Sequence, residues 1–342
     1  SINKDVLEIA KERDKKLEGE INSIYGIPIL LKDNIGYDKL PTTAGAYSLR
    51  KNFTENAFIV NRLKEEGAII LGKTNLSEWA NYFCLGCPNG YSALGGQTLN
   101  PYGRKILDTG GSSSGSGVAT ASNLSSVSIG SETSGSILSP SSSNSLVGMK
   151  PTIGHISRSG IVPISSTLDT AGPMTKFVID NIIVYNSIIG LDDNDFYSKT
   201  TSSINLEKIF NSTLKKKKLG YYSNYYKSDS IYKLNVELLK SNGAELFELN
   251  PNSVELNNFR KLLDEDMRRD LVSYLEDYGN INLEVKDVAS IIDFNSKDSI
   301  ERSPYGQGIF RGILNNPFSD DEYINLRESL LSGGNLYYNQ SF

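Results

Sequence analysis

The spacing of hydrophobic residues in the first half of the chain predicts short helices that alternate with buried strands. Residues 2–17 carry apolar side chains at helical spacing among charged ones, which predicts an amphipathic helix. The apolar run at 27–31 is typical of a buried strand, and the run at 68–71 predicts a second one. Between them, Thr54 is positioned to cap a helix that ends near Glu66. This order of elements predicts an α/β layer architecture.

The stretch from Thr109 to Pro140 combines two clusters of glycine and serine with apolar segments. Dense glycine and serine are typical of a flexible linker. The apolar runs at 118–121 and 127–129 are not expected in a linker. We therefore expect a short helix and a short strand there, with the Gly/Ser clusters as ordered turns. Glycine lets a backbone approach a ligand closely, and serine supplies a nucleophilic oxygen. This stretch is the candidate active site.

The composition becomes polar after residue 190, and this change predicts a boundary. We expect residues 1–190 to form the core that holds the candidate active site. Residues 191–342 are expected to form a variable α/β and helical part packed on that core. Before the boundary, Asp169–Met174 predicts a tight turn and Phe177–Ile189 predicts a buried helix.

Beyond the boundary the hydrophobic pattern is weaker but still interpretable. Residues 219–249 show an apolar run, a helical pattern that stops at an Asn-Gly pair, and a second apolar run, which together predict a βαβ-like unit. Helices are expected at 253–275 and 284–294, whereas the tail from Pro317 has little pattern.

Composition and charge narrow the functional class. The chain has 342 residues, 38% of them hydrophobic, and a formal net charge of −5. It can therefore bury a substantial core, and it lacks the basic face that a nucleic-acid partner requires. The basic cluster Lys215–Lys218 is interpreted as a solvated lead-in to a strand. No run approaches the roughly 18 apolar residues of a membrane span, and the N-terminus lacks a signal-peptide pattern. We expect a cytoplasmic protein without a membrane span, although the first residue is not Met.

Cysteine and histidine are too few for several common chemistries. Cys84 and Cys87 have CxxC spacing, but no second Cys/His pair completes a tetrahedral zinc site. A turn at 88–90 follows them where a thioredoxin-like motif needs a helix, so we interpret them as two ordinary thiols, with a disulfide or redox pair as the alternative. His155 is the single histidine, and we interpret it as a turn or strand surface residue.

Serine chemistry with lysine as the base remains. Lys32 ends the apolar strand at 27–31, an unusual place because lysine is rarely buried. Burial disfavours the ammonium form, and catalytic lysines are tuned in this way from a pKa of about 10.4 toward about 7–8. The plain alternative is a strand-end lysine whose amine reaches solvent. The neighbouring motifs favour the catalytic role.

Four motifs, in this order along the chain, resemble the amidase signature family. They are Gly26–Asn34 (GIPILLKDN), Gly72–Trp79 (GKTNLSEW), Gly110–Ser116 (GGSSSGS) and Gly135–Ile137 (GSI). Two further segments, Gly96–Pro101 and Asp169–Met174, resemble its peptide-amidase-like branch. The similarity is dense over about residues 5–190 and continues weakly to Tyr305–Gln307. It implies a large mixed β-sheet covered by helices on both faces, with a more helical C-terminal part.

The resemblance also implies a mechanism, residue by residue. Ser136 matches the nucleophile, Ser112 the bridging serine held by a cis peptide bond, and Lys32 the base. Such enzymes attack an amide carbonyl, form an acyl-enzyme, release ammonia or an amine, and let water complete hydrolysis. The implied oxyanion hole is made of the backbone N–H groups of Thr133, Ser134, Gly135 and Ser136. The implied substrate is a small amide or a peptide C-terminal amide, with neither metal nor cofactor.

Three departures from the family pattern bear on activity. Ser134 stands where this branch usually has Asp, and Leu138 stands where many members carry Arg. Without that Arg, an anionic substrate is less favourable. The chain also ends at Phe342, before the family's C-terminal strands are expected to finish, so we expect those strands to be missing.

Two alternatives to an active, cofactor-free amide hydrolase stay open. The first is the amidase component of a tRNA-dependent amidotransferase, which needs a partner and tRNA. The low basic charge and the peptide-amidase-like motifs disfavour it. The second is an inactive or impaired amidase-fold remnant or binding protein, which the short C-terminal end favours. The sequence does not determine the oligomeric state.

Overall fold

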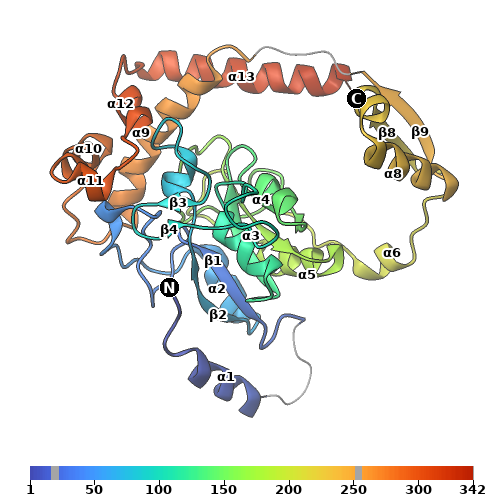
Figure 1. The fold of residues 1–342 in the computed structure, drawn as a ribbon, viewed down its shortest axis with the longest axis horizontal. Helices are drawn as coiled ribbons and strands as arrows, with labels where there is room; N and C mark the ends of the chain where they lie inside the picture. The colour runs from blue at the N-terminus through green and yellow to red at the C-terminus, as the bar shows by residue number, and fades with distance from the viewer. Residues whose placement is uncertain (17–22, 251–255, 342) are drawn as a thin grey trace. The chain divides into compact units, whose positions relative to one another are not determined.

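A five-stranded mixed sheet is formed by strands between residues 28 and 175 of the structure, a computed structural model that describes residues 1–16, 23–250 and 256–341 (Figure 1). The strand order is β2-β1-β5-β7-β6. β1 runs parallel to both β2 and β5, whereas β7 is antiparallel to β5 and β6. The bounds are β1 Pro28–Lys32, β2 Ile69–Thr74, β5 Val127–Glu132, β6 Val147–Gly148 and β7 Thr170–Thr175. The expected mixed α/β sheet is confirmed.

Helices cover both faces of this sheet. α2 (Phe58–Glu65) and α5 (Val178–Ile188) pack against each other and share one hydrophobic core with the strands. α3 (Ser114–Ala121) covers the opposite face and contacts β1, β5 and β7. Burial of branched aliphatic side chains on the first face, at about 25 cal/mol per Å², is the main force that holds these layers together. The smaller serine and glycine residues of α3 let its backbone approach the second face closely.

The parallel strands bring the residues at their carboxyl ends to one edge of the sheet. Lys32 ends β1 and lies in register with Thr74, which ends β2. Glu132 ends the neighbouring β5. In open α/β sheets, sites form outside the carboxyl ends of parallel strands. The fold therefore places the candidate base beside the Gly/Ser-rich loops that precede α3 and follow β5.

Three local expectations need correction. Asp169–Met174 is not a tight turn, because residues 170–175 pair with β5 and β6 as a central strand. Its Gly172-Pro173 pair is typical of turns, but cross-strand pairing overrides that preference. Thr54 does not cap α2, which begins four residues later after Ala57, and the Thr54 hydroxyl donates instead to the Glu55 carbonyl (2.9 Å). β2 also continues to Thr74, beyond the predicted end of that strand.

The chain divides into two compact units, and the division differs from the predicted boundary at residue 190. The first unit contains Ser1–Ile204 and Leu263–Pro317, and the second contains Asn205–Leu262 and Phe318–Phe342. Leu263–Pro317 therefore belongs to the unit that holds the candidate site. Buried side chains of α9 (Phe259–Asp277), such as Met267 and Leu271, provide the physical reason, since they join the interior of that unit.

The second unit contains the predicted βαβ arrangement. β8 (Lys218–Tyr222) and β9 (Glu245–Leu249) pair in parallel, and α8 (Ser230–Ser241) connects them. The structure adds α6 (Leu206–Phe210), α7 (Ser223–Ser228) and α13 (Asp320–Ser341). The tail from Pro317, which has little sequence pattern, is thus largely helical. Residues 253–255 of the helix expected at 253–275 lie outside the described residues.

The remaining elements of the first unit are mostly short. α1 (Val6–Lys15) and α10 (Val288–Ser296) form where helices are predicted. The others are η1 Tyr47–Leu49, η2 Glu78–Asn81, β3 Tyr91–Ser92, β4 Gly96–Gln97, α4 Leu138–Ser143, α11 Ser299–Arg302 and α12 Gly308–Ile313. No helix among the described residues is both long enough and apolar enough to cross a membrane.

The interpretation of Cys84 and Cys87 as two ordinary thiols is wrong for this structure. The two residues form a disulfide, with their Cα atoms 5.8 Å apart. That separation lies within the usual range of about 4.4–6.8 Å. The chain turns between them at Gly86, whose positive φ of 75° lets the two side chains meet.

Candidate active site

Lys32 lies at the centre of the site, with its amine fully buried. The Lys32 Nζ donates to Ser112 Oγ at 2.7 Å. It also contacts the carbonyl and the hydroxyl oxygens of Ser131, each at 3.0 Å. β1 supplies Lys32, and the loop before α3 supplies Ser112, so two segments far apart in sequence meet here. The alternative of a strand-end lysine that reaches solvent is excluded, because the side chain is 0% exposed.

Burial lowers the pKa of Lys32 from 10.5 to about 7. The main cause is loss of hydration, which penalises the ammonium form. The nearby carboxylates of Asp169 and Glu132 oppose this shift, since negative charge favours the ammonium. Near neutral pH a large fraction of Lys32 is therefore the neutral amine, the form that accepts a proton.

Ser112 is held in one place by backbone contacts. The Gly111–Ser112 peptide bond is cis, as the family resemblance implies. The Ser112 carbonyl accepts a hydrogen bond from the Ser77 N–H (3.0 Å), and the side chain is completely buried. At residue 111 a Cβ would lie 2.5 Å from Asn89 Oδ1 and 2.8 Å from Ser77 Oγ, so a side chain there would displace these polar groups. These contacts fix the Ser112 hydroxyl against the Lys32 amine.

Ser136 lies in the turn between β5 and α4, next to the loop of Ser112. Its carbonyl accepts a hydrogen bond from the Ser113 N–H at 3.1 Å, and the residue is 7% exposed. Among the described residues, no hydrogen bond joins the hydroxyls of Ser136 and Ser112. The structure thus joins Lys32 and Ser112 directly and places Ser136 beside them through the backbone of Ser113.

Glu132 organises the turn that carries Ser136, a role that the sequence motifs did not reveal. Its Oε1 accepts from the Gly135 N–H (2.8 Å), and its Oε2 accepts from the N–H groups of Ile137 (2.7 Å) and Leu138 (3.0 Å). The side chain is 3% exposed. A buried carboxylate satisfied by backbone donors fixes the loop around it. The sequence offers one indication of this role: Glu132 is the one acidic residue within the stretch Thr109–Pro140.

This arrangement corrects the expected oxyanion hole at one position. The Gly135 N–H donates to Glu132, so it is not directed at a substrate oxygen. The N–H groups of Thr133, Ser134 and Ser136 have no hydrogen-bond partner among the described residues. Three of the four expected donors therefore remain available.

Replacing Glu132 with alanine is expected to lower the free energy of unfolding by about 2–4 kcal/mol. The main reason is that the buried Ile137 N–H loses its acceptor, and an unpaired buried donor costs about 1–3 kcal/mol. The partly buried N–H groups of Gly135 and Leu138 add less, because water can replace the carboxylate there. Urea unfolding measures the change. The matched control is Glu276→Ala, an exposed helical residue, which should change stability by less than about 0.5 kcal/mol. Equal stability of the two variants would contradict the role given to Glu132.

A cavity of about 310 Å³ opens next to this cluster. Asp169 forms part of its wall, where it accepts from the Thr133 hydroxyl and from the N–H groups of Ile164 (2.7 Å) and Ser165 (2.9 Å). Burial raises the pKa of Asp169. Residues around the cavity include Asn34, Ser131, Thr133, Arg158, Ile161, Val162, Asp195, Asp270, Tyr274, Asp277 and Tyr278. The cavity meets the cluster at Ser131 and Thr133.

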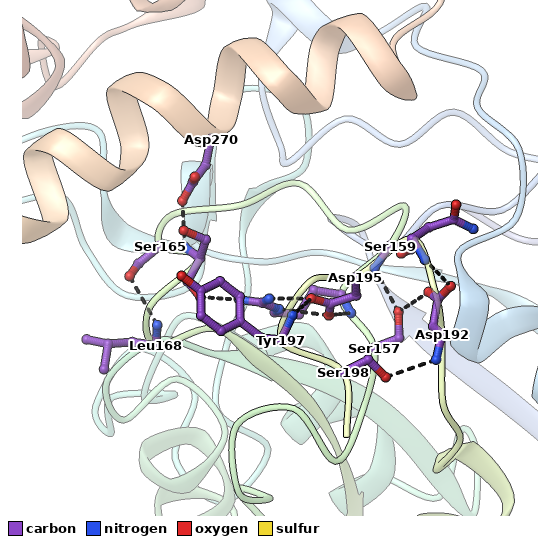
Figure 2. A network of polar contacts seen from close by, with 12 residues as sticks. Ser157, Ser159, Ser165, Leu168, Asp192, Asp195, Tyr197, Ser198 and Asp270 are labelled. Carbon is purple, nitrogen blue, oxygen red and sulfur yellow. Dashed lines mark hydrogen bonds and ion pairs between the residues drawn. The ribbon is translucent and has the colours of Figure 1, made fainter. Parts of the chain in front are cut away.

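A polar network supports one side of the cavity. Figure 2 shows Asp195 and Tyr197 close to the segment of Ser157 and Ser159, while Asp270 reaches from α9 toward the loop at Ser165. Arg158 pairs with Asp195, and the Ser157 hydroxyl donates to Asp192. These contacts hold residues 157–158 against residues 192–195, and the Ser166 N–H donates to Asp270 of α9 (2.5 Å).

His155 takes no part in this cluster. Its Nδ1 lies 3.1 Å from the Tyr185 hydroxyl, and the residue is half-buried. Among the described residues, no group of three or more His, Cys, Asp or Glu side chains is arranged to hold a metal ion.

The fold and this cluster define a protein of a known class. The Amidase family model matches residues 1–303. The chain therefore belongs to the amidase family.

Individual relatives agree with this assignment. A probable amidase of Arabidopsis thaliana is 43% identical over 243 residues, which cover 68% of this chain and 46% of that protein. A glutamyl-tRNA(Gln) amidotransferase component of Thermoanaerobacter pseudethanolicus is 36% identical over 257 residues, covering 73% of this chain and 51% of that protein. This chain thus spans about half the length of these two relatives.

Solved structures resemble the chain over most of its length. An amidase family protein from Bacillus anthracis superposes with a TM-score of 0.92 at 35% identity, covering 99% of this chain and 69% of that one. The native peptide amidase of Stenotrophomonas maltophilia gives a TM-score of 0.88 at 36% identity, with coverage of 96% and 70%. These likenesses support the peptide-amidase-like branch.

Proposed function

We propose that the chain hydrolyses the C–N bond of a carboxamide through a seryl acyl-enzyme. One observation carries the proposal: a buried Lys32 amine, with a pKa near 7, in hydrogen bond with Ser112 at 2.7 Å. A base that is neutral at working pH and already bonded to a serine is what serine activation without histidine requires.

In the proposed reaction, neutral Lys32 takes a proton from Ser112 while Ser112 takes one from Ser136. The Ser136 oxygen attacks the amide carbonyl, and the tetrahedral intermediate carries a negative oxygen. The free N–H groups of Thr133, Ser134 and Ser136 are suited to stabilise that charge, with each such donor worth about 3 kcal/mol. The C–N bond breaks as the proton returns to the nitrogen, and ammonia or an amine leaves. Water then attacks the ester by the same relay and restores Ser136.

The substrate class that we propose is a peptide C-terminal amide or a small carboxamide. The likeness to peptide amidases supports it, as does a cavity large enough for one or two amino-acid side chains. The match to amidotransferase components supports a second candidate, amide hydrolysis that delivers ammonia within a larger assembly.

A panel of carboxamides tests the function. Ammonia release from N-acetyl amino-acid amides by the chain alone, abolished by Ser136→Ala, is the expected result. Release only after addition of an amidotransferase partner would favour the second candidate. No release from any amide under either condition would reject hydrolysis and leave an inactive amidase-fold protein.

The rate should depend on pH through Lys32. Because the neutral amine is the active form, kcat/KM on an uncharged amide is expected to rise about tenfold per pH unit below 7 and to level off above it. Asp270 also has a pKa of about 7, raised mainly by burial, so Asp270→Asn is the matched variant. The rise should persist in that variant. A flat profile between about pH 5 and 9, or a fall toward alkaline pH, would contradict a neutral Lys32 base.

A further inference from the structure

The cavity beside the site has one wall built from a single helix face. Asp270, Ser273, Tyr274, Asp277 and Tyr278 line the cavity, and their spacing places them along one side of α9. α9 ends at Asp277, which itself lines the cavity, so the C-terminal end of the helix lies beside it. Helix C-termini favour positive charge, because the carbonyl ends of the peptide dipoles point outward there.

The titratable groups that line the cavity are predominantly acidic. Four carboxyl groups and one guanidinium line it. The positive charge of Arg158 is already neutralised, since its guanidinium binds Asp195 and the Ser166 carbonyl and lies over the Tyr197 ring at 4.7 Å.

Two of these carboxyl groups have few protein donors. Asp270 accepts from the Ser166 N–H (2.5 Å) on the loop opposite α9. Asp277 is exposed and has no hydrogen-bond or ion-pair partner among the described residues. Asp270 and Asp277 therefore keep acceptor capacity that a ligand can use.

A separate observation indicates a ligand with N–H groups. The Asn34 side chain is 3% exposed, and its Oδ1 has no hydrogen-bond partner among the described residues. Its Nδ2 donates to Ser131 Oγ (2.9 Å) and to the Val162 carbonyl (3.3 Å), which fixes the orientation of the amide. The residue lines the cavity next to Ser131, a partner of Lys32. A buried acceptor without a donor is costly, and a donor from a bound molecule would satisfy it.

The surfaces between these polar groups are apolar or aromatic. Residues 161–164 present Ile161, Val162, Pro163 and Ile164 along one side. On the other side, the rings of Tyr274 and Tyr278 stack with centroids 5.8 Å apart. Aliphatic walls suit a hydrocarbon stem, and the face of a tyrosine ring attracts a cation.

We propose that this cavity binds a positively charged group carried on an apolar stem, such as a lysine or arginine side chain, of the amide substrate. The cation would lie near Asp270, Asp277 and the Tyr278 ring, the stem along residues 161–164, and a substrate N–H at Asn34 Oδ1. This inference rests on the proposed function for the position of the scissile amide, and it adds the substrate class.

Three N-acetyl amino-acid amides of similar size test the preference: those of lysine, norleucine and glutamate. We expect kcat/KM for the lysine amide to exceed that for the norleucine amide about tenfold, and the glutamate amide to be the poorest. Asp277→Asn should reduce the lysine-to-norleucine ratio about fivefold. The matched control, Glu276→Gln, changes the adjacent exposed carboxylate outside the cavity and should leave the ratio unchanged. A ratio near one in the wild-type protein would overturn the proposal, and so would equal effects of the two variants.

Binding to Ser136→Ala separates this inference from the proposed function. Isothermal titration with the same amides should show tighter binding of the lysine amide than of the norleucine amide. If no amide is hydrolysed but this difference in binding is present, the proposal of a cation-binding cavity is supported and the proposal of hydrolysis is rejected. If amides are hydrolysed but the lysine and norleucine amides bind equally, the proposal of a cation-binding cavity is overturned and the proposal of hydrolysis is supported.

Discussion

Lys32→Met is expected to lower kcat for amide hydrolysis by about 10³–10⁴-fold while the protein remains folded. The variant keeps the length of the buried stem but removes the proton acceptor next to Ser112. The Ser131 oxygens keep other partners, because Ser113 Oγ donates to its carbonyl (3.1 Å) and Asn34 Nδ2 to its hydroxyl (2.9 Å). Loss of the Lys32 amine therefore leaves no unpaired group at Ser131.

Lys32→Arg distinguishes a base from a positive charge. Arginine stays protonated in proteins, so it cannot take a proton from Ser112. We expect Lys32→Arg to be as inactive as Lys32→Met, measured by ammonia release with the unfolding free energy as the fold control. Substantial activity in the arginine variant would mean that charge, and not proton transfer, is what Lys32 supplies.

Ser136→Ala is expected to lower kcat by about 10⁴-fold or more, since it removes the atom to which the acyl group would be bonded. Stability should change little. The fold uses the Ser136 carbonyl, which accepts from Ser113, and the described residues make no hydrogen bond to the Ser136 hydroxyl. Ser139→Ala, an exposed serine three positions later on α4, is the matched control and should keep full activity. Equal activity of the two alanine variants in the ammonia assay would remove Ser136 from the reaction.

The sequence predicted the central elements because they depend on local patterns. A few residues are enough to predict the strand that ends at Lys32 and to mark the Gly/Ser-rich stretch with Ser112 and Ser136 as the candidate site. The parallel strands place Lys32 at the carboxyl edge of the sheet, and the loop before α3 brings Ser112 to it. The resemblance to a family supplied the roles of these residues, which spacing alone did not.

The features that were missed depend on contacts between distant segments or on turn geometry. The Gly172-Pro173 pair predicted a turn, but pairing with β5 and β6 makes it part of a strand. Glu132 cannot be assigned its role from the sequence, because its hydrogen bonds exist only once the following turn has formed. That turn also removes Gly135 from the expected set of oxyanion donors.

The cavity wall and the division into units were unpredictable for the same reason. The sequence predicts a helix at 253–275, but the spacing of its apolar residues does not show which of the two units it packs in. Contacts such as those from Ser165 and Ser166 to Asp266 and Asp270 place it beside the candidate site. The predicted boundary at residue 190 assumed that the first unit was one continuous stretch, and Leu263–Pro317 returns to it.

Detection of the acyl-enzyme tests the central claim most directly. The protein is mixed with an activated ester, p-nitrophenyl acetate, quenched in acid within seconds and digested, and the peptide that contains Ser136 is analysed by mass spectrometry. We predict one acetyl group on Ser136 in the wild-type protein and none at that residue in Lys32→Met treated in the same way. An acetyl group on another residue only, or equal labelling of Ser136 in the two proteins, would contradict a Ser136 nucleophile activated through Ser112 by Lys32.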